Sequence, residues 1–338
     1  MKNAINYFYN FKIDNIRMIN KDYYFSFEQK NYLFQNIKDT FLDYKALNEL
    51  NNNLIFANRS FFQIVPNKDN NIITIIAENN YILMLDNSLE DREFDFYDLL
   101  ETNISIDITK HMNSLIRTNW DELWKNKIDY FEMYVNQNIN KRKIINKYIN
   151  YFIGLSENAI SYVTKLNSGK MENNYDKLVV SHKRINDNKS LKQLYNPLYL
   201  VIDYPSRDIS EYLKMVFFEN KDIDISKYID TIKLTNYGAG LIIARMLFPS
   251  FFFDLLENFF EDKNIEKEII VMADKMFYYE KYLFKIYNLL KEKYDIPEIN
   301  WLKKVDYSST LTTPKTSGTS FTNIDSMPSL SVTSIMLQ

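Results

Sequence analysis

The chain has 338 residues, of which 46% are hydrophobic and 16% aromatic, so a mainly disordered protein is excluded. Its 41 basic and 44 acidic residues give a formal net charge of −3, which provides no overall attraction to nucleic acid or to an anionic membrane surface. Because it has no cysteine and only two histidines, disulfides, thiolate metal sites and a cysteine nucleophile are excluded, and a zinc enzyme is not expected.

The first 98 residues are predicted to form a β-rich lobe. They begin without the apolar stretch of a secretory signal, so we expect residence in the cytoplasm. Short β-branched or aromatic runs predict strands at 23–27, 31–37, 61–66, 72–76 and 81–85. Residues 78–80, Glu-Asn-Asn, favour a hairpin turn because Asn tolerates left-handed backbone angles. One helix, between about residues 40 and 51, interrupts the strands.

From about residue 99, apolar residues recur at three- and four-residue steps, which predicts helices. The clearest stripes run through 123–135, 209–217 and, as one long helix, 269–293. We interpret them as packed core rather than as a cofactor site. The most apolar stretch, 241–256, contains Pro249 and is too short and too broken to cross a bilayer. We therefore expect no membrane insertion, and a buried helix that Pro249 kinks or splits.

The order of these elements predicts an α+β fold. A small antiparallel β-rich N-lobe over residues 1–98 precedes a large, mainly helical C-lobe over residues 99–306. Residues 307–338 are rich in Ser and Thr with almost no charge, and we expect them to form a disordered tail. This arrangement favours a bilobal protein-kinase-like fold, in which the cleft between the lobes would hold a nucleotide.

Two segments of the second half resemble the active-site loops of aminoglycoside phosphotransferases and choline kinases. Residues 178–186 lead from an apolar run into His182, and residues 198–209 lead from another into Asp203. In that superfamily the first loop reads His-x-Asp with an Asn five residues later, and the second begins with a metal-binding Asp. The resemblance implies ATP and Mg²⁺ as cofactors and Asp203 as a Mg²⁺ ligand. The residues alone leave a structural carboxylate beside a helix equally open.

Four segments in order are similar to the signatures of the YutH-type spore coat proteins, relatives of the CotS coat kinases. They are Gly-Leu-Ser-Glu-Asn-Ala-Ile at 154–160, Ser-His-Lys-Arg at 181–184, Asp-Tyr-Pro-Ser-Arg-Asp-Ile at 203–209 and Ala-Arg-Met-Leu-Phe-Pro at 244–249. The similarity covers roughly residues 20 to 303. It implies a phosphotransferase-like fold, a place in the spore coat besides the cytoplasm, and other spore coat proteins as partners.

The first of these loops departs from the superfamily pattern at its catalytic positions. Arg184 stands where the catalytic Asp belongs, and Lys189 stands at the Asn position. A guanidinium cannot serve as a base, because it stays protonated at any physiological pH. Asp187 and Asn188 could supply the missing groups if the loop is remodelled.

The N-lobe also lacks the phosphate-binding features of a kinase. The strand expected to carry the phosphate-binding Lys has Gln35 at that place. The first glycine of the chain is Gly154, so no glycine-rich loop precedes it to wrap phosphates with backbone amides.

The remaining candidate residues have structural interpretations. We expect His182 to be a hydrogen-bonded structural histidine rather than a base. Arg207 and Asp208 are predicted to form a buried ion pair, with Asp208 capping the following helix. Glu157 and Asn158, just inside a helix, are expected to bond neighbouring loops.

Two functions from different classes follow. The first is a catalytically impaired kinase-like protein, a pseudokinase, with a structural or assembly role in the spore coat. The second is an active ATP-dependent phosphotransferase with a remodelled catalytic loop. A third possibility is a host that forms no spores, in which the fold serves another binding role.

Overall fold

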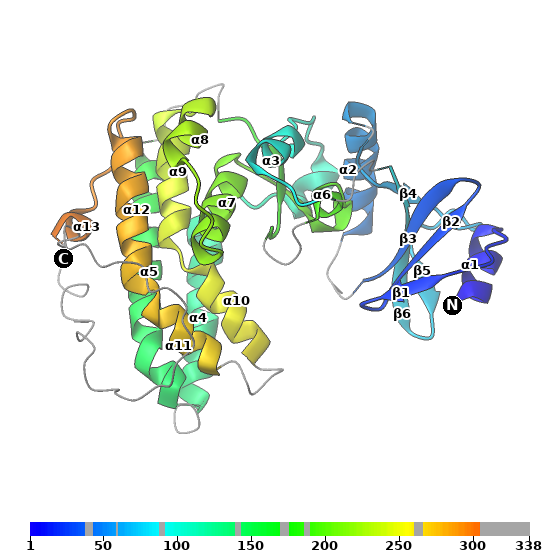
Figure 1. Cartoon of the computed structure of the whole chain (residues 1–338), viewed down its shortest axis with the longest axis horizontal. Helices are drawn as coiled ribbons and strands as arrows, with labels where there is room; N and C mark the ends of the chain where they lie inside the picture. Colours follow the sequence, from blue (N-terminus) through cyan, green and yellow to red (C-terminus); the bar gives the residue numbers. More distant parts are fainter. Residues whose placement is uncertain are drawn as a thin grey trace. The chain divides into compact units, whose positions relative to one another are not determined.

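A computed structural model describes the chain over eight ranges: 1–37, 43–58, 60–87, 92–138, 143–169, 176–185, 190–259 and 266–304. Its contacts divide the chain into two compact units. The first unit combines Met1–Thr118 with Asp176–Met215, and the second combines Asn119–Tyr175 with Val216–Gln338 (Figure 1). The tail predicted at 307–338 lies outside the described residues.

An antiparallel sheet forms the first part of the first unit. Its strands are β1 (Arg17–Ile19), β2 (Asp22–Phe27), β3 (Lys30–Ile37), β4 (Gln63–Val65), β5 (Thr74–Ile76) and β6 (Asn79–Asp86). The spatial order is β1-β2-β3-β6-β4, and β5 also pairs with β6. All five predicted strands are present, so the alternation of β-branched and aromatic residues identified the sheet correctly.

The turn between β5 and β6 lies earlier than predicted. Ala77 and Glu78 carry positive φ angles of 48° and 65°, while Asn79 and Asn80 already pair with β5. A two-residue connection whose central residues both have positive φ matches the right-handed twist of the strands it joins. The two-residue length of the connection, rather than the preference of Asn for positive φ, therefore decides which residues adopt these angles.

Two helices accompany the sheet. The sequence did not predict α1 (Lys2–Tyr9), which buries Ile5 and Tyr9 in a core cluster with Phe34 and Leu83. Helix α2 (Tyr44–Ala57) begins and ends later than the predicted 40–51. Its start is fixed by Asp43, whose carboxylate accepts from the backbone amides of the first turn.

A second, two-stranded sheet completes the first unit. The elements are α3 (Phe96–Thr102), η1 (Lys110–Leu115), β7 (Val179–His182), α6 (Leu191–Leu194), η3 (Pro197–Tyr199), β8 (Leu200–Asp203) and α7 (Ser206–Phe218), whose last three residues belong to the second unit. Strands β7 and β8 pair antiparallel and every residue of both is buried. Each of the two apolar runs is a strand; the first ends in His182 and the second in Asp203.

The second unit is helical. It contains α4 (Trp120–Asn138), α5 (Lys143–Ser168), α8 (Ile225–Thr231), α9 (Asn236–Leu247), α10 (Ser250–Phe259), α11 (Glu266–Asp274), α12 (Met276–Lys291) and α13 (Asn300–Lys304) (Figure 1). Helix α5 packs against α4, α9 and α11, and α12 packs against α8 and α9. The apolar stretch 241–256 is split at Pro249 into α9 and α10, as predicted. The single helix predicted at 269–293 is wrong, because Lys275 separates α11 from α12.

Within the described ranges, no individual helix has both the length and the hydropathy to cross a membrane. Helices α9 and α10 pass that test only as a pair that bends by 43° at the break between them. Helix α9 is buried along nearly its whole length inside the second unit.

Candidate functional site

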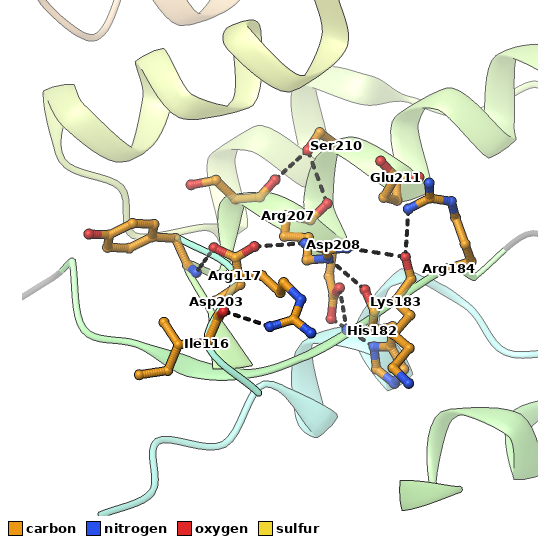
Figure 2. Close-up of polar contacts among 12 residues, drawn as sticks. Ile116, Arg117, His182, Lys183, Arg184, Asp203, Arg207, Asp208, Ser210 and Glu211 are labelled. Atoms are coloured by element: carbon orange, nitrogen blue, oxygen red, sulfur yellow. Dashed lines mark hydrogen bonds and ion pairs between the residues drawn. The ribbon is translucent and has the colours of Figure 1, made fainter. Parts of the chain in front are cut away.

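The candidate site lies in the first unit, where β7 and β8 end and α7 begins (Figure 2). Strand β8 places Asp203 in the interior with 0% of its surface exposed. One carboxylate oxygen accepts from the backbone amide of Tyr204 at 2.8 Å, and the other accepts from Nη1 of Arg207 at 2.8 Å. Both oxygens of the carboxylate at the metal-ligand position are thus engaged by groups of the chain itself.

Arg207 joins the ends of the two strands. Besides Asp203, its guanidinium donates from Nε to the carbonyl of His182 at 2.7 Å and from Nη2 to the carbonyl of Lys183 at 3.2 Å. A guanidinium presents its donors in a rigid planar fork, which suits this set of three acceptors. It balances the Asp203 charge and fixes the backbone that follows β7.

The predicted ion pair between Arg207 and Asp208 is wrong. Consecutive residues on a helix point in different directions, so these two side chains diverge from the first turn of α7. Asp208 instead accepts from the amide of His182 at 2.8 Å, from its Nδ1 at 2.8 Å and from Nδ2 of Asn103 at 2.7 Å. It lies within the first turn of α7 rather than before it, so it is not the N-cap residue.

His182 is held on both sides of its ring. Only 1% of it is exposed, Nδ1 lies 2.8 Å from Asp208, and Nε2 lies 3.1 Å from the carbonyl oxygen of Leu194. Each ring nitrogen thus lies within hydrogen-bond distance of a protein oxygen. This geometry makes His182 a connector between strands and loop, with no ring nitrogen left for a substrate proton.

The position of the catalytic base is occupied by Arg184. Its side chain is half-buried, and Nη1 donates to the carbonyl of Lys183 at 2.8 Å (Figure 2). Asp187, Asn188 and Lys189 lie outside the described residues.

Gln35, at the place expected for the phosphate-binding Lys, is buried and fully engaged. Its Nε2 donates to the hydroxyl of Tyr199 at 2.7 Å, and its Oε1 accepts from Nδ2 of Asn196 at 2.9 Å. Sequence reasoning missed both partners, along with Asn103. The Asn196-Pro197 pair signals a turn, but no local pattern indicates that this turn meets β3.

Glu157 and Asn158 do not join this group. Both belong to α5 in the second unit, well inside the helix. Glu157 is exposed, and Nδ2 of Asn158 donates to the carbonyl of Gly154 in the same helix at 2.8 Å. The expectation that Asn158 bonds a neighbouring loop is therefore wrong.

Arg92 forms an ion pair with Asp98, a residue in the first turn of α3. Both terminal nitrogens of Arg92 donate to the carboxylate of Asp98 at 2.6 Å, and the amide of Asp95 donates to it as well. Burial alone would raise the pKa of Asp98, but these hydrogen bonds and the Arg92 charge together lower it.

The Asp203 carboxylate, as the chain holds it, does not fit a Mg²⁺ ion. Mg²⁺ needs free, hard oxygen ligands in near-octahedral geometry, usually carboxylates and phosphate oxygens. The Asp203 carboxylate already carries a guanidinium counter-ion, and the described residues contain no group of three His, Asp or Glu side chains that could hold a metal ion. A cation is already supplied at this position by Arg207.

Comparisons with known proteins agree with this architecture. An aminoglycoside phosphotransferase from Alicyclobacillus acidocaldarius superposes with a TM-score of 0.58 at 9% identity, over 86% of this chain and 97% of that one. An amicoumacin kinase in complex with AMP-PNP and Ca²⁺ gives a TM-score of 0.49 at 10% identity, over 87% and 93% of the two chains. The first likeness shows an aminoglycoside-phosphotransferase-like, kinase-like fold.

Sequence comparison identifies the family. The endospore coat-associated protein YutH of Bacillus subtilis (strain 168) is 24% identical over 211 residues, which are 55% of this chain and 61% of that protein. The match thus spans less than two thirds of the relative's length. The family described as "Spore coat putative kinase YutH" matches residues 2–286. The chain therefore belongs to this family of kinase-like spore coat proteins.

Proposed function

We propose that the chain is a pseudokinase of the endospore coat, which keeps the kinase-like fold as a binding or assembly element and transfers no phosphoryl group. The observation that carries this proposal is the buried bond between Arg207 and Asp203. It places a fixed cation on the carboxylate that a working kinase offers to Mg²⁺.

The other catalytic positions support the same conclusion. Phosphoryl transfer needs an Asp to orient and deprotonate the attacking hydroxyl, and a Lys to hold the phosphates. Arg184 carries a permanent positive charge, and Gln35 is neutral with both ends of its amide engaged. Three positions that perform the chemistry in kinases therefore make contacts that stabilise the fold.

We infer a location in the spore coat and other coat proteins as partners from the family and from the endospore-coat relative. A kinase-like fold that catalyses no reaction still has large surfaces on both units that other proteins can contact. A structural or assembly role needs only such a surface and a stable core.

The alternative is an active phosphotransferase with a remodelled loop. It is favoured by one observation, the presence of a carboxylate at position 203, and it would need Asp187 as the base. Thermal unfolding of the full chain with ATP and Mg²⁺ at millimolar concentration separates the two. We expect no rise in Tm, whereas a rise of several degrees that Asp203→Asn or Asp187→Asn abolishes would favour the enzyme.

The location needs its own test. In a sporulating host, a tagged copy of the chain is expected in the coat fraction extracted from purified spores. Recovery of the tagged chain from vegetative cells, with none in the coat extract, would refute the coat assignment.

A further inference from the structure

Ten residues between β7 and β8 carry a feature that the proposed function leaves unexplained. Ser190–Tyr199, here called the connecting segment, contains α6 and η3 and lies entirely in the first unit. Six of its residues are buried: Leu191, Leu194, Tyr195, Asn196, Pro197 and Leu198. A polar surface loop would leave such residues in water, so this segment is packed as part of the core.

The segment bonds through its backbone to the sheet and its linker. The amide of Leu191 donates to the carbonyl of Arg92, which precedes α3, at 2.8 Å. The amide of Phe62, just before β4, donates to the carbonyl of Tyr195 at 3.0 Å. These bonds do not depend on side-chain identity, so they fix the path of the segment along the edge of the lobe.

Side chains add four contacts to the same lobe. Lys192 pairs with Asp86, the last residue of β6, at 3.0 Å. The rings of Tyr195 and Phe61 meet edge to face with centroids 5.2 Å apart. Asn196 and Tyr199 both bond to Gln35 on β3, as described above. The segment therefore touches β3, β6 and the approach to β4.

On its other side the segment bonds to the end of β7. The carbonyl of Leu194 faces Nε2 of His182 at 3.1 Å, and the carbonyl of Tyr199 accepts from the amide of Lys183 at 2.8 Å. The same ten residues thus bind the antiparallel sheet and the β7–β8 hairpin. Separation of these two layers requires the loss of contacts on at least one side.

We propose that the connecting segment is a latch, which holds the antiparallel sheet on the β7–β8 hairpin, covers Gln35, and loses its contacts to both only as one unit. In kinases β3 presents the phosphate-binding Lys toward the cleft. Here Asn196 and Tyr199 approach the corresponding residue within hydrogen-bond distance, so protein atoms stand where a ligand phosphate would approach β3. The proposal rests on the proposed function only in comparing Gln35 with the phosphate-binding Lys of a kinase.

Hydrogen–deuterium exchange of the full chain tests whether the segment opens as one unit. The double variant Asn196→Ala/Tyr199→Phe removes the contacts of the segment with β3. The variant Lys192→Ala separately removes its ion pair with β6. Both variants are expected to accelerate exchange of the same three amides, those of Phe62, Lys183 and Leu191. We expect about 30-fold acceleration in the first variant, from the loss of one buried and one part-buried hydrogen bond. We expect about three-fold acceleration in the second, from the loss of one partly exposed ion pair. Asn79→Ala removes an exposed amide of the same lobe and is expected to change none of the three.

Faster exchange only at the amides nearest the removed contacts would overturn the proposal, because the contacts of the segment would then be independent of one another. Unchanged protection of all three amides in both variants would overturn it as well. Amides of α5 in the second unit report whether each variant is folded. Since ATP takes no part in the readout, failure of the proposed function would appear in the nucleotide titration and not here.

Discussion

The bond between Arg207 and Asp203 gives the sharpest prediction about stability. Arg207→Ala takes the guanidinium partner away from a carboxylate with 0% exposure, and it also removes the donors to the carbonyls of His182 and Lys183. Removing one partner of a buried ion pair costs about 3–5 kcal/mol, and each lost hydrogen bond costs about 1 kcal/mol. We therefore expect Arg207→Ala to lower the free energy of unfolding by about 5 kcal/mol.

Asp203→Ala should cost less. Its guanidinium partner keeps two carbonyl acceptors and retains partial contact with solvent, so a loss of about 3 kcal/mol is expected. The double variant Asp203→Ala/Arg207→Ala contains no unpaired charge. The double variant should lose about 2–3 kcal/mol less unfolding free energy than the two single variants lose in total.

Urea unfolding of the four proteins at pH 7, followed by circular dichroism with and without Mg²⁺, measures this cycle. Arg207→Lys is the matched control, because it keeps the charge and loses the fork. Costs that add to within about 0.5 kcal/mol would refute the coupling. The reasoning would also fail if Arg207→Ala were as stable as the wild type, or if Mg²⁺ restored its stability, since Asp203 would then be a metal ligand.

Three further predictions concern other sites. Burial raises the pKa of Glu280 even though Tyr151 donates to its carboxylate, so this group stabilises the fold below its unfolded pKa of about 4.3 and loses that contribution as pH rises through the folded pKa. Glu280→Gln should therefore raise Tm at pH 7 and leave Tm unchanged at pH 4. Equal changes of Tm at both pH values would contradict this prediction. The lowered pKa of Asp98 has the opposite sign, so Asp98→Asn should destabilise the protein at pH 7 and progressively less as pH falls below about 4 in urea titrations. A Cβ at Gly240 would lie 2.9 Å from Cδ1 of Leu166, so Gly240→Ala should lower the free energy of unfolding by about 1–3 kcal/mol. The double variant Gly240→Ala/Leu166→Ala removes the clash and should regain part of that loss. A double variant that regains none of it would contradict the clash.

Local patterns were sufficient for most elements of the fold. The strands follow runs of β-branched and aromatic residues, and Pro249 marks the break between α9 and α10. Helix α1 was missed because it is only eight residues long, too short for its helical spacing to stand out in a polar and aromatic sequence. The division of 269–293 at Lys275 was missed because the apolar period continues across the break.

The candidate site was predicted less completely than the fold. The positions of His182 and Asp203 at strand ends followed from the apolar runs before them. The pairing of Arg207 with Asp203 did not follow from the sequence. Asp208 is adjacent to Arg207 in sequence, but consecutive residues of a helix point in different directions. The bonds of Gln35 to Asn196 and Tyr199 join residues about 160 positions apart, and only the tertiary fold brings them together.

Phosphoryl transfer itself is the most direct test of the central claim. Purified full chain, labelled ATP, Mg²⁺ and proteins extracted from spore coats would be incubated together, with Asp203→Asn as the matched control. We predict that the wild-type chain consumes no more ATP, and labels no more protein, than the variant does. Turnover in the range of ordinary kinases, about 1–100 per second, that disappears in Asp203→Asn would contradict the account.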